Sequence, residues 1–512
     1  MNTKICETIE RCKRRIARRL DKSDVRGSER PMLTATNIHY EVAQRTRATG
    51  AGGMAAIHLL VKQLGLEEAI DRHLHLFKLH LPYHESDHVL NIAYNLLAGG
   101  SCLEHLELLR SDEAYLDALG ARRIPDPTTA GDFCRRFDIS DILGLMEVFN
   151  ATRVKLWRRQ PKAFFRQAVI EADGTMVETT GECKQGMDIN YKGQWGYHPL
   201  VLSLANTGEP LYVVNRAGNR PSHEHAAIYF DRAIGLCRQA GFKKILLRGD
   251  TDFTQTGHLD RWDDAGDVRF LFGIDAMPNL YEAVEKLPKT AWKALKRPAK
   301  HEVKTQPRQR PENVKDKIVQ EREFESIRLV KEYVAEFSYQ PVKCRKAYRV
   351  IVVWKDLEVS KGQKKLFDDD RCFFYITNDW ETPAEQIVYL ANDRCNQENL
   401  LQQLKSGVRS LTAPVDNLLS NWAYMVMASL AWSLKAWSAL VLPEGGRWSE
   451  KYREEKRRLL RMDFATFRHA MVSVPGQIVH TGRKIVCRLL AWNPWQHVFF
   501  RLLDQIALSL RC

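Results

Sequence analysis

Apolar residues recur at helical spacing through the first third of the chain. Near the N-terminus they alternate with basic residues, which predicts an amphipathic helix with a cationic face. Its apolar positions are Ile5, Ile9, Cys12, Ile16 and Leu20. Similar periodicity over 51–150, interrupted by turn signals such as Gly99-Gly100, predicts a set of short helices. Residues 1–150 are therefore expected to form a basic helical region, either a DNA-binding module or a packing domain.

The pattern changes at about residue 165. Short apolar runs such as AVIEADGT, YHPLVLSLAN and KKILLRGD predict strands, and a helical stretch closed by Gly241 lies among them. This order predicts an α/β sheet whose first part covers 165–275. Strand-like segments then resume in a basic, β-rich insertion at 276–365, and the sheet and a long helix from about Pro383 occupy 366–410. A helical region is expected over 411–512.

Two segments have unusual composition. Residues 286–317 hold eleven Lys or Arg against three acids, with four prolines, and are predicted to form an exposed basic insertion. Residues 422–442 are long and apolar enough to mimic a membrane span. Lys435 and three serines interrupt this segment, and a charge deep in a bilayer costs roughly 2.5 kcal/mol or more. A buried helix is therefore preferred to a membrane span.

The overall composition narrows the class of partner. The chain has 512 residues, enough for several domains, and a net charge of +14. Such a surplus indicates a polyanionic partner, with DNA, RNA and an acidic membrane surface all compatible. The 11 cysteines form no CxxC pair, and no unbroken apolar stretch at the N-terminus resembles a secretory signal. A reducing cytoplasm without membrane attachment is the expected location.

Two acids stand where predicted strands end, Asp173 after AVIEA and Asp250 after KKILLRG. The ends of parallel strands meet at one edge of an open sheet, where ligands bind. Two carboxylates at that edge repel each other unless a cation joins them, and Mg²⁺ or Mn²⁺ has the oxygen preference for this role. Each acid taken alone is equally compatible with an ordinary turn residue.

A third acid lies in NDRCNQENLLQQLKSG. On a continuous helix, Arg394, Glu398 and Lys405 would project from one face, because their offsets of four and eleven residues return to nearly the same angle. A carboxylate between two cations suits a metal ligand beside phosphate-binding groups. A solvent-exposed salt bridge between Arg394 and Glu398 explains the spacing equally well.

The motifs IEADGT, LLRGDTDF and RCNQENLLQQLKSG resemble those of the DDE transposases of bacterial insertion sequences. The R-x3-E-x6-K spacing resembles the Tyr-Arg-Glu-Lys group, and the wording, with LLSNWAYMVMASLAW, most resembles insertion-sequence family 1380. The signature tyrosine would stand three positions before Arg394, where this chain has Ala391. Tyr389 lies two residues earlier, so the tyrosine's role is open. Asp252, next to Asp250, leaves an exchange of ligands conceivable.

This resemblance implies an RNase H-like catalytic core interrupted by the β-rich insertion. It implies that Asp173, Asp250 and Glu398 are the catalytic residues and bind two Mg²⁺ (or Mn²⁺) ions, while Arg394 and Lys405 position DNA phosphates. Members of the family cut transposon ends and join the 3′-hydroxyl to target DNA, and they act as homodimers on paired ends. The implied partner is DNA, in a bacterial cytoplasm.

Three alternatives stay open at this point. The chain could be an inactive, domesticated relative that only binds DNA, or an RNase H-like nuclease that cuts without joining. A zinc site at histidines such as His84 and His88 is less favoured, because no cysteine or HExxH motif accompanies them. Trp262 and Trp292 could stack on a DNA base, although packing in the protein is the better expectation for both.

Overall fold

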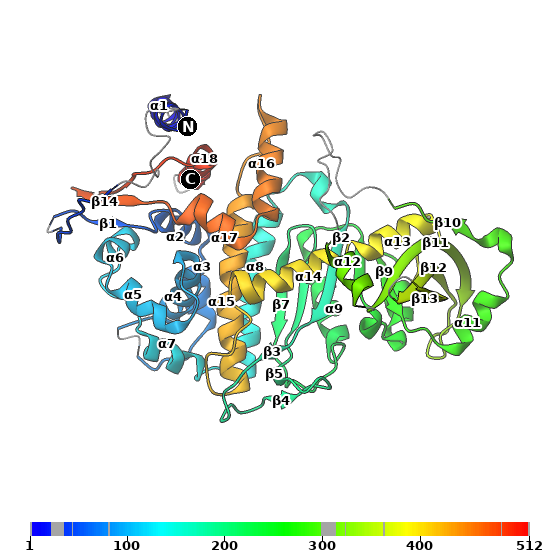
Figure 1. The fold of residues 1–512 in the computed structure, drawn as a ribbon. Coiled ribbons are helices and arrows are strands. Elements are labelled where there is room, and N and C mark those ends of the chain that lie inside the picture. The colour runs from blue at the N-terminus through cyan, green and yellow to red at the C-terminus, as the bar shows by residue number, and fades with distance from the viewer. Residues whose placement is uncertain are drawn as a thin grey trace. The chain divides into compact units, whose positions relative to one another are not determined.

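The computed structural model describes residues 3–21, 35–43, 45–79, 82–297, 314–322, 324–361, 364–482 and 484–509 (Figure 1). The chain forms two compact units, each assembled from segments that are separate in sequence. The helical unit comprises residues 1–161, 175–220 and 399–512, and the sheet unit comprises 162–174 and 221–398. Residues 298–313, half of the predicted basic stretch 286–317, lie outside the described residues, and the domain boundaries expected from the sequence stay predictions.

The N-terminal part of the helical unit is a series of helices, as the periodicity predicted. The helix α7 begins where Asp126 accepts a hydrogen bond from the Thr129 amide and Pro127 occupies the first turn. In α4 nearly every residue is buried, because neighbouring helices cover it on all sides. The helices are α1 (Thr3–Leu20), α2 (Met54–Leu64), α3 (Leu66–His73), α4 (Glu85–Ala98), α5 (Leu106–Arg110), α6 (Glu113–Leu119), α7 (Pro127–Cys134) and α8 (Ile139–Trp157).

The helix α15 (Leu418–Leu440) is buried over all but its first two residues, which confirms the predicted buried helix. It packs against α4, α8 and α16 (Ser449–Arg461). Lys435 within it is buried too, and its ammonium donates to the Leu460 carbonyl at 2.8 Å and lies 3.8 Å from the ring centre of Trp432. None of the helices in the described part of the chain combines the length and hydropathy that crossing a membrane requires.

The remaining elements of the helical unit are two small sheets, one hairpin and two C-terminal helices. One sheet joins β1 (Ala48–Thr49), β14 (Gly476–Thr481) and β15 (Lys484–Leu489), and the other joins β3 (Val177–Glu178), β5 (Trp195–Tyr197) and β4 (Asp188–Ile189). The hairpin pairs β6 (Leu200–Leu204) with β7 (Glu209–Val214). The two helices are α17 (Phe464–Phe467) and α18 (Gln496–Ser509).

A buried carboxylate, Glu209 at the start of β7, holds three of these elements together. It accepts hydrogen bonds from Arg153 at 2.9 Å and Trp157 at 2.9 Å, both on α8. It also accepts one from Trp437 on α15 at 2.8 Å. Because both members of the Arg153–Glu209 pair are buried, the hydrogen bonds to them must be in place for the two charges to be tolerated.

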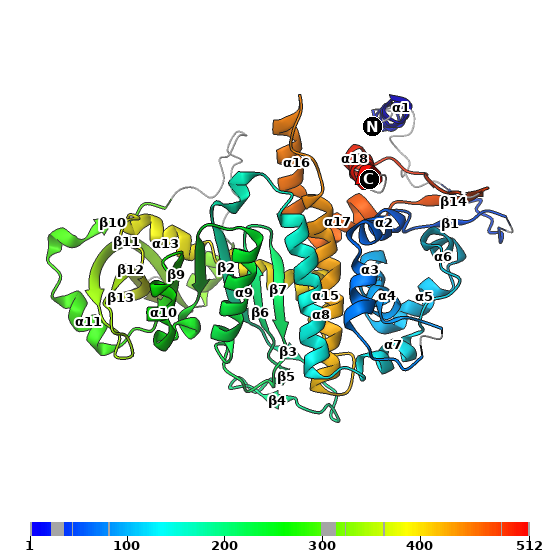
Figure 2. The same cartoon turned by 180° about the vertical axis from the view of Figure 1, so that it is seen from behind.

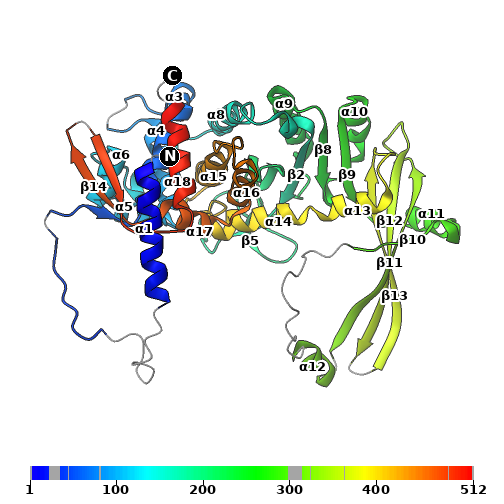
Figure 3. The same ribbon diagram turned by 90° about the horizontal axis from the view of Figure 1, so that it is seen from above.

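The sheet unit confirms the predicted α/β class with a mixed sheet. Three parallel strands, β2 (Ala168–Gly174), β8 (Ile245–Gly249) and β9 (Val268–Ile274), lie in the order β2-β8-β9. The helix α9 (Ala226–Ala240) packs beside β2 and β8 (Figure 2). Beyond β9 the sheet continues antiparallel through three long strands, β13 (Lys364–Thr377), β12 (Tyr348–Lys361) and β11 (Glu325–Tyr339), to β10 (Lys293–Ala294) (Figure 3). Three shorter helices complete the unit: α10 (Leu259–Asp264), α11 (Pro278–Glu285) and α12 (Val314–Glu321).

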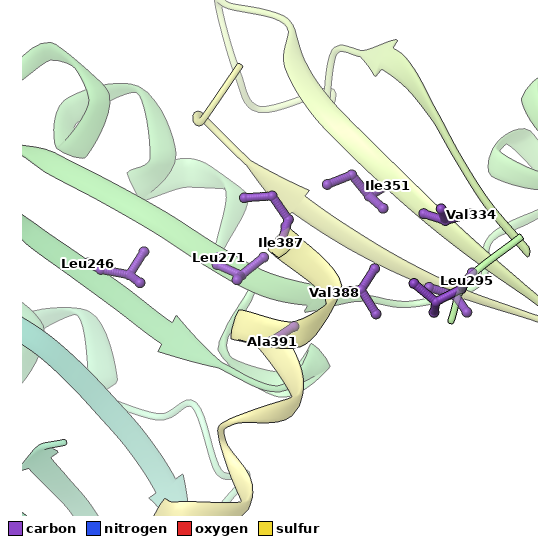
Figure 4. Close-up of a cluster of buried hydrophobic side chains, with 9 residues drawn as sticks. Leu246, Leu271, Leu295, Val334, Ile351, Ile387, Val388 and Ala391 are labelled. Atoms are coloured by element: carbon purple, nitrogen blue, oxygen red, sulfur yellow. The ribbon is translucent and has the colours of Figure 1, made fainter. Parts of the chain in front are cut away.

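The helix α13 (Ala384–Asn392) lies across this sheet and seals its hydrophobic core (Figure 4). Its residues Ile387, Val388 and Ala391 pack against side chains of β8, β9, β11 and β12. The buried partners are Leu246, Leu271, Leu295, Val334, Ile351 and Val353. This contact fixes α13 over both the parallel and the antiparallel strands.

The long helix expected from Pro383 onward is interrupted. After α13 the chain makes a turn at Asp393 and Arg394, and then forms α14 (Cys395–Gln402) and the π-helical turn η7 (Gln403–Gly407). The Asn392 side chain donates to the Val388 carbonyl at 2.7 Å, a local bond that competes with continued helix formation. Arg394 and Glu398 project from the same side, since they form an i,i+4 salt bridge at 3.4 Å. Lys405 lies in the π-helical turn, and the common face expected for all three residues stays a prediction.

Replacing Glu209 with Ala tests the buried network of the helical unit. The change leaves the Arg153 guanidinium buried without its carboxylate, so we expect a loss of roughly 3–5 kcal/mol in the free energy of unfolding. Urea unfolding followed by tryptophan fluorescence measures it. The control is Glu113→Ala, because that side chain is 77% exposed. A Glu209→Ala protein as stable as the control would contradict the assigned role.

Lys435 predicts a specific pH dependence of stability. Burial lowers the pKa of Lys435 to about 7 in the folded protein, against 10.5 ordinarily. Between these values the unfolded chain binds more protons, so the contribution of Lys435 to stability rises with pH by at most about 1.4 kcal/mol per unit. We expect Lys435→Met to remove this rise between pH 7 and 9, as measured by urea unfolding. The exposed Lys451→Met is the control, and an unchanged slope in Lys435→Met would refute the prediction.

Candidate functional site

Two predicted acids lie at equivalent ends of neighbouring parallel strands. In the register of β2 and β8, Glu171 is opposite Arg248, and Asp173 and Asp250 follow two residues later on each strand. The half-buried Asp173 carboxylate accepts a hydrogen bond from the Gly174 amide at 2.8 Å. The parallel pairing therefore brings together two acids that are 77 positions apart in the sequence.

Asp250 is held by the turn that follows β8. Its carboxylate accepts a hydrogen bond from the Asp252 amide at 3.1 Å and caps the short helical turn Thr251–Phe253. Gly273 on β9 leaves room for this turn, since a Cβ there would lie 3.0 Å from the Thr251 nitrogen. Asp252 is exposed, and its backbone supports Asp250.

Arg394 connects Asp250 to the third predicted acid. Its guanidinium lies 3.0 Å from the Asp250 carboxylate through Nη1 and 3.4 Å from that of Glu398 through Nη2. The side chain of Glu398 is 57% exposed. All three line a pocket of about 520 Å³ whose other walls include Phe373 and Tyr375. The exposed salt bridge considered for Arg394 and Glu398 exists, and Asp250 shares it.

The pKa values of Asp173 and Asp250 reflect the burial and the charged neighbours of these two carboxylates. Burial, the neighbouring Asp250 and Glu398 together raise the pKa of Asp173 to about 7, although Arg394 and the Gly174 amide act in the opposite direction. Burial also raises the pKa of Asp250, an effect that Arg394 reduces and Asp252 increases. The carboxylates thus destabilise one another's charged forms, and a cation among them relieves this.

The donor set suits a divalent cation by its chemistry. Carboxylate oxygens that repel each other are the ligands that Mg²⁺ and Mn²⁺ prefer. Within the described residues, no three His, Cys, Asp or Glu side chains lie close enough together to hold a metal ion. Between Asp250 and Glu398 the compensating positive charge is the Arg394 guanidinium. The histidine proposed as a zinc ligand, His88, is buried and stacked on Phe133 with ring centres 4.4 Å apart.

Lys405 lies in the helical unit, on η7. Its ammonium donates to the Met176 carbonyl at 2.7 Å and lies 3.5 Å from the Thr175 hydroxyl. These two residues directly follow the β2 strand that carries Asp173. In this structure Lys405 therefore binds the backbone next to that strand.

The aromatic residues singled out in the sequence have partners within the protein. The Tyr389 hydroxyl donates to the Lys296 carbonyl at 2.5 Å, and its ring packs on the core cluster under α13. Trp262 is buried and donates to Asp231, while Trp292 packs edge-on against Trp354. The aromatic residues that line the acidic pocket are Phe373, Phe374 and Tyr375, which the sequence reasoning missed.

A buried ion pair behind the acids was also missed. Arg248 donates to the Glu171 carboxylate at 2.8 Å through Nε and to the Leu390 carbonyl of α13 at 2.5 Å through Nη1. Side chains two residues apart on a strand share a face, so this pair lies one step behind Asp173 and Asp250. The matching motifs E-x-D and R-x-D carried a signal for it. The pair ties β2, β8 and α13 together.

Arg248→Met tests this tie. Removing the guanidinium leaves Glu171 buried and unpaired, so we expect the unfolding free energy to fall by roughly 3–5 kcal/mol. The double variant Glu171→Leu with Arg248→Met removes both charges and should regain most of that loss, because apolar replacements of buried pairs are often nearly neutral. Denaturant unfolding of the four proteins measures the coupling. Additive effects of the two substitutions would disprove the pairing.

Comparison with known proteins supplies the family. The family model described as "Transposase DDE domain group 1" matches residues 38–510. No curated protein matches the chain. A cryo-EM structure of the piggyBac transposase synaptic complex with hairpin DNA is similar, with 10% sequence identity and a TM-score of 0.36 over 83% of this chain and 84% of that one. Since the family model covers most of the sequence, the chain belongs to the DDE transposase domain family, group 1.

Proposed function

We propose that this protein is a DNA transposase that cuts transposon-end DNA and joins the freed 3′-hydroxyl to target DNA. Asp173, Asp250 and Glu398 are the proposed catalytic residues and would hold two Mg²⁺ or Mn²⁺ ions. The observation that carries the proposal is the convergence of Asp250 and Glu398 on one guanidinium, with Asp173 electrostatically coupled to both. In a member of the DDE transposase family, a set of carboxylates of this kind supports the proposal of metal-dependent phosphodiester cleavage.

The order of elements supports an RNase H-like core. Along the chain, strand β2 is followed by the short strands β3, β4 and β5, then by the β6–β7 hairpin, helix α9, strand β8 and strand β9. The three strands β2, β8 and β9 are parallel, and Asp173 and Asp250 stand at the ends of the first two. The long antiparallel strands between Asp250 and Glu398 fit an inserted domain. Assignment to insertion-sequence family 1380, in the Tyr-Arg-Glu-Lys group, rests on the motif wording and is part of the proposal.

The side chains of the site have distinct proposed tasks. When bound, divalent cations would polarise the scissile phosphate and lower the pKa of an attacking water or hydroxyl. Asp173 and Asp250 present oxygens from two rigid strand ends, and Glu398 adds one from α14. Arg394 and Lys405 would position phosphates and offset the negative charge that develops on them. The tie between Arg248 and α13 keeps Arg394 beside the two aspartates.

DNA is the proposed partner. The net charge of +14 favours a polyanion, and α1 has a row of basic side chains on a helix without buried residues. These are Arg11, Arg14, Arg15, Arg18 and Arg19. A homodimer on paired transposon ends and a bacterial cytoplasmic location belong to the same proposal and rest on the motif resemblance.

Asp173→Asn tests the function. It keeps the shape of the side chain and removes its charge, so we expect end cleavage and strand transfer to fall by at least about a thousandfold, while binding of end DNA changes by less than about threefold. The matched control is Asp252→Asn, an exposed neighbour that should retain most of the activity. Cleavage of labelled transposon ends, with integration into a plasmid, measures both steps.

The outcomes separate the competing functions. If Asp173→Asn cleaves as well as the unaltered protein, the proposed function is wrong. If Asp252→Asn is inactive and Asp250→Asn is active, the assignment of Asp250 as the ligand is wrong. Nicks without integration products from the unaltered protein would indicate a nuclease that does not join DNA, and end binding without any cleavage would indicate an inactive relative.

A further inference from the structure

Arg394 occupies an unusual place for a residue expected to bind DNA phosphate. Both of its terminal nitrogens are engaged by carboxylates of the protein itself, Asp250 at 3.0 Å and Glu398 at 3.4 Å. Its side chain is 25% exposed, less than that of either partner. Of the five N–H donors of a guanidinium, those that face Asp250 and Glu398 are engaged within the protein, and a phosphate could reach only the others.

The carboxylates that Arg394 contacts are those a divalent cation would need. A metal ion held by Asp250 and Glu398 would draw on the same two carboxylates that now accept from Nη1 and Nη2. Arginine stays protonated at any physiological pH, so its positive charge would also oppose a nearby cation. The guanidinium and the metal ion are therefore alternative occupants of the space between these two side chains.

The local backbone allows the side chain to leave without disturbing the fold. Arg394 lies in the turn between α13 and α14, outside either helix. The core cluster and the Arg248 bond fix α13 up to Ala391, three residues before Arg394. The pocket of about 520 Å³ beside Asp250 and Glu398 offers the guanidinium space to move into.

We propose that Arg394 is the internal counter-cation of Asp250 and Glu398, that divalent metal displaces it, and that its guanidinium then becomes available to a DNA phosphate. This inference rests on the proposed metal-dependent function. It sets an order of events, because the phosphate contact of Arg394 forms only after metal has taken its place. It also distinguishes Arg394 from a simple phosphate-binding residue, whose removal would leave metal affinity unchanged or reduce it by disturbing the site.

Metal binding to the full-length protein without DNA tests the competition. Titration with Mn²⁺, with the free ion measured by electron paramagnetic resonance, gives the affinity. We expect Arg394→Gln to bind Mn²⁺ about tenfold more tightly, which corresponds to loss of one charge-assisted contact of about 1.4 kcal/mol. Arg394→Lys keeps the positive charge and loses the contact with two carboxylates at once. Its Mn²⁺ affinity should therefore lie between those of the unaltered protein and Arg394→Gln.

The control is Arg297→Gln. Arg297 lies in the same unit and pairs with Glu332. Its positive charge, like that of Arg394, lowers the pKa of Tyr375, against the larger effect of burial. Its removal should change Mn²⁺ affinity by less than about twofold, since it does not occupy the carboxylates. Raising the salt concentration screens through-space effects, so the Arg394→Gln difference should persist in high salt.

A second measurement follows Arg394 itself in the unaltered protein. Modification by an arginine-selective dicarbonyl reagent, read by peptide mass spectrometry, should increase at Arg394 when Mn²⁺ is added and stay constant at Arg297. Mn²⁺ affinity that is equal or weaker in Arg394→Gln, or Arg394 reactivity that does not rise with Mn²⁺, overturns the inference. Absence of Mn²⁺ binding by both proteins overturns it as well.

These results are separable from those that test the function. Release of Arg394 by Mn²⁺ in a protein that never cuts DNA supports the inference and contradicts the proposed function. Cleavage that depends on Asp173, combined with weaker metal binding by Arg394→Gln, contradicts the inference alone.

Discussion

The geometry of the candidate site depends on one buried ion pair, that between Glu171 and Arg248. It joins the two strands that carry Asp173 and Asp250, and through the Leu390 carbonyl it reaches the helix that leads to Arg394. Burial raises the pKa of Glu171, and Arg248 opposes this effect, so the carboxylate depends on its partner to stay charged. A buried charge tolerates few alternative arrangements, which makes this pair a constraint on register as well as a contact.

The helical unit uses the same device at another place. Arg153 and Glu209 are both fully buried, and two tryptophan side chains supply the remaining hydrogen bonds. Such pairs contribute little net stability compared with apolar packing, yet removing one partner is costly. In both units the buried charge fixes which strand lies against which helix. In the sheet unit that relation places the acids, and in the helical unit it orients the long helix α15.

The candidate site differs from these two ion pairs, because most of its charged side chains are acids. Burial raises the pKa of Asp173, and the negative charges of Asp250 and Glu398 add to this effect. Arg394 relieves part of it from a position where the helix is broken. A cation held by a flexible side chain is replaceable, whereas the buried pair behind it is not. The site thus combines a fixed framework with an exchangeable positive charge.

By itself the sequence determined the elements and the candidates. Asp173 and Asp250 follow apolar runs, and a strand with an acid at its end is a local pattern, so both positions were predictable. The buried helix around Lys435 was predictable for the same reason. Only the tertiary structure decided the rest. The contact of Arg394 with Asp250, the bond of Tyr389 to Lys296 and the Glu171–Arg248 pair all join residues far apart along the chain. Periodicity reports which face of an element is apolar, but the partners of a polar side chain are set by packing, which brings together groups that no local pattern relates.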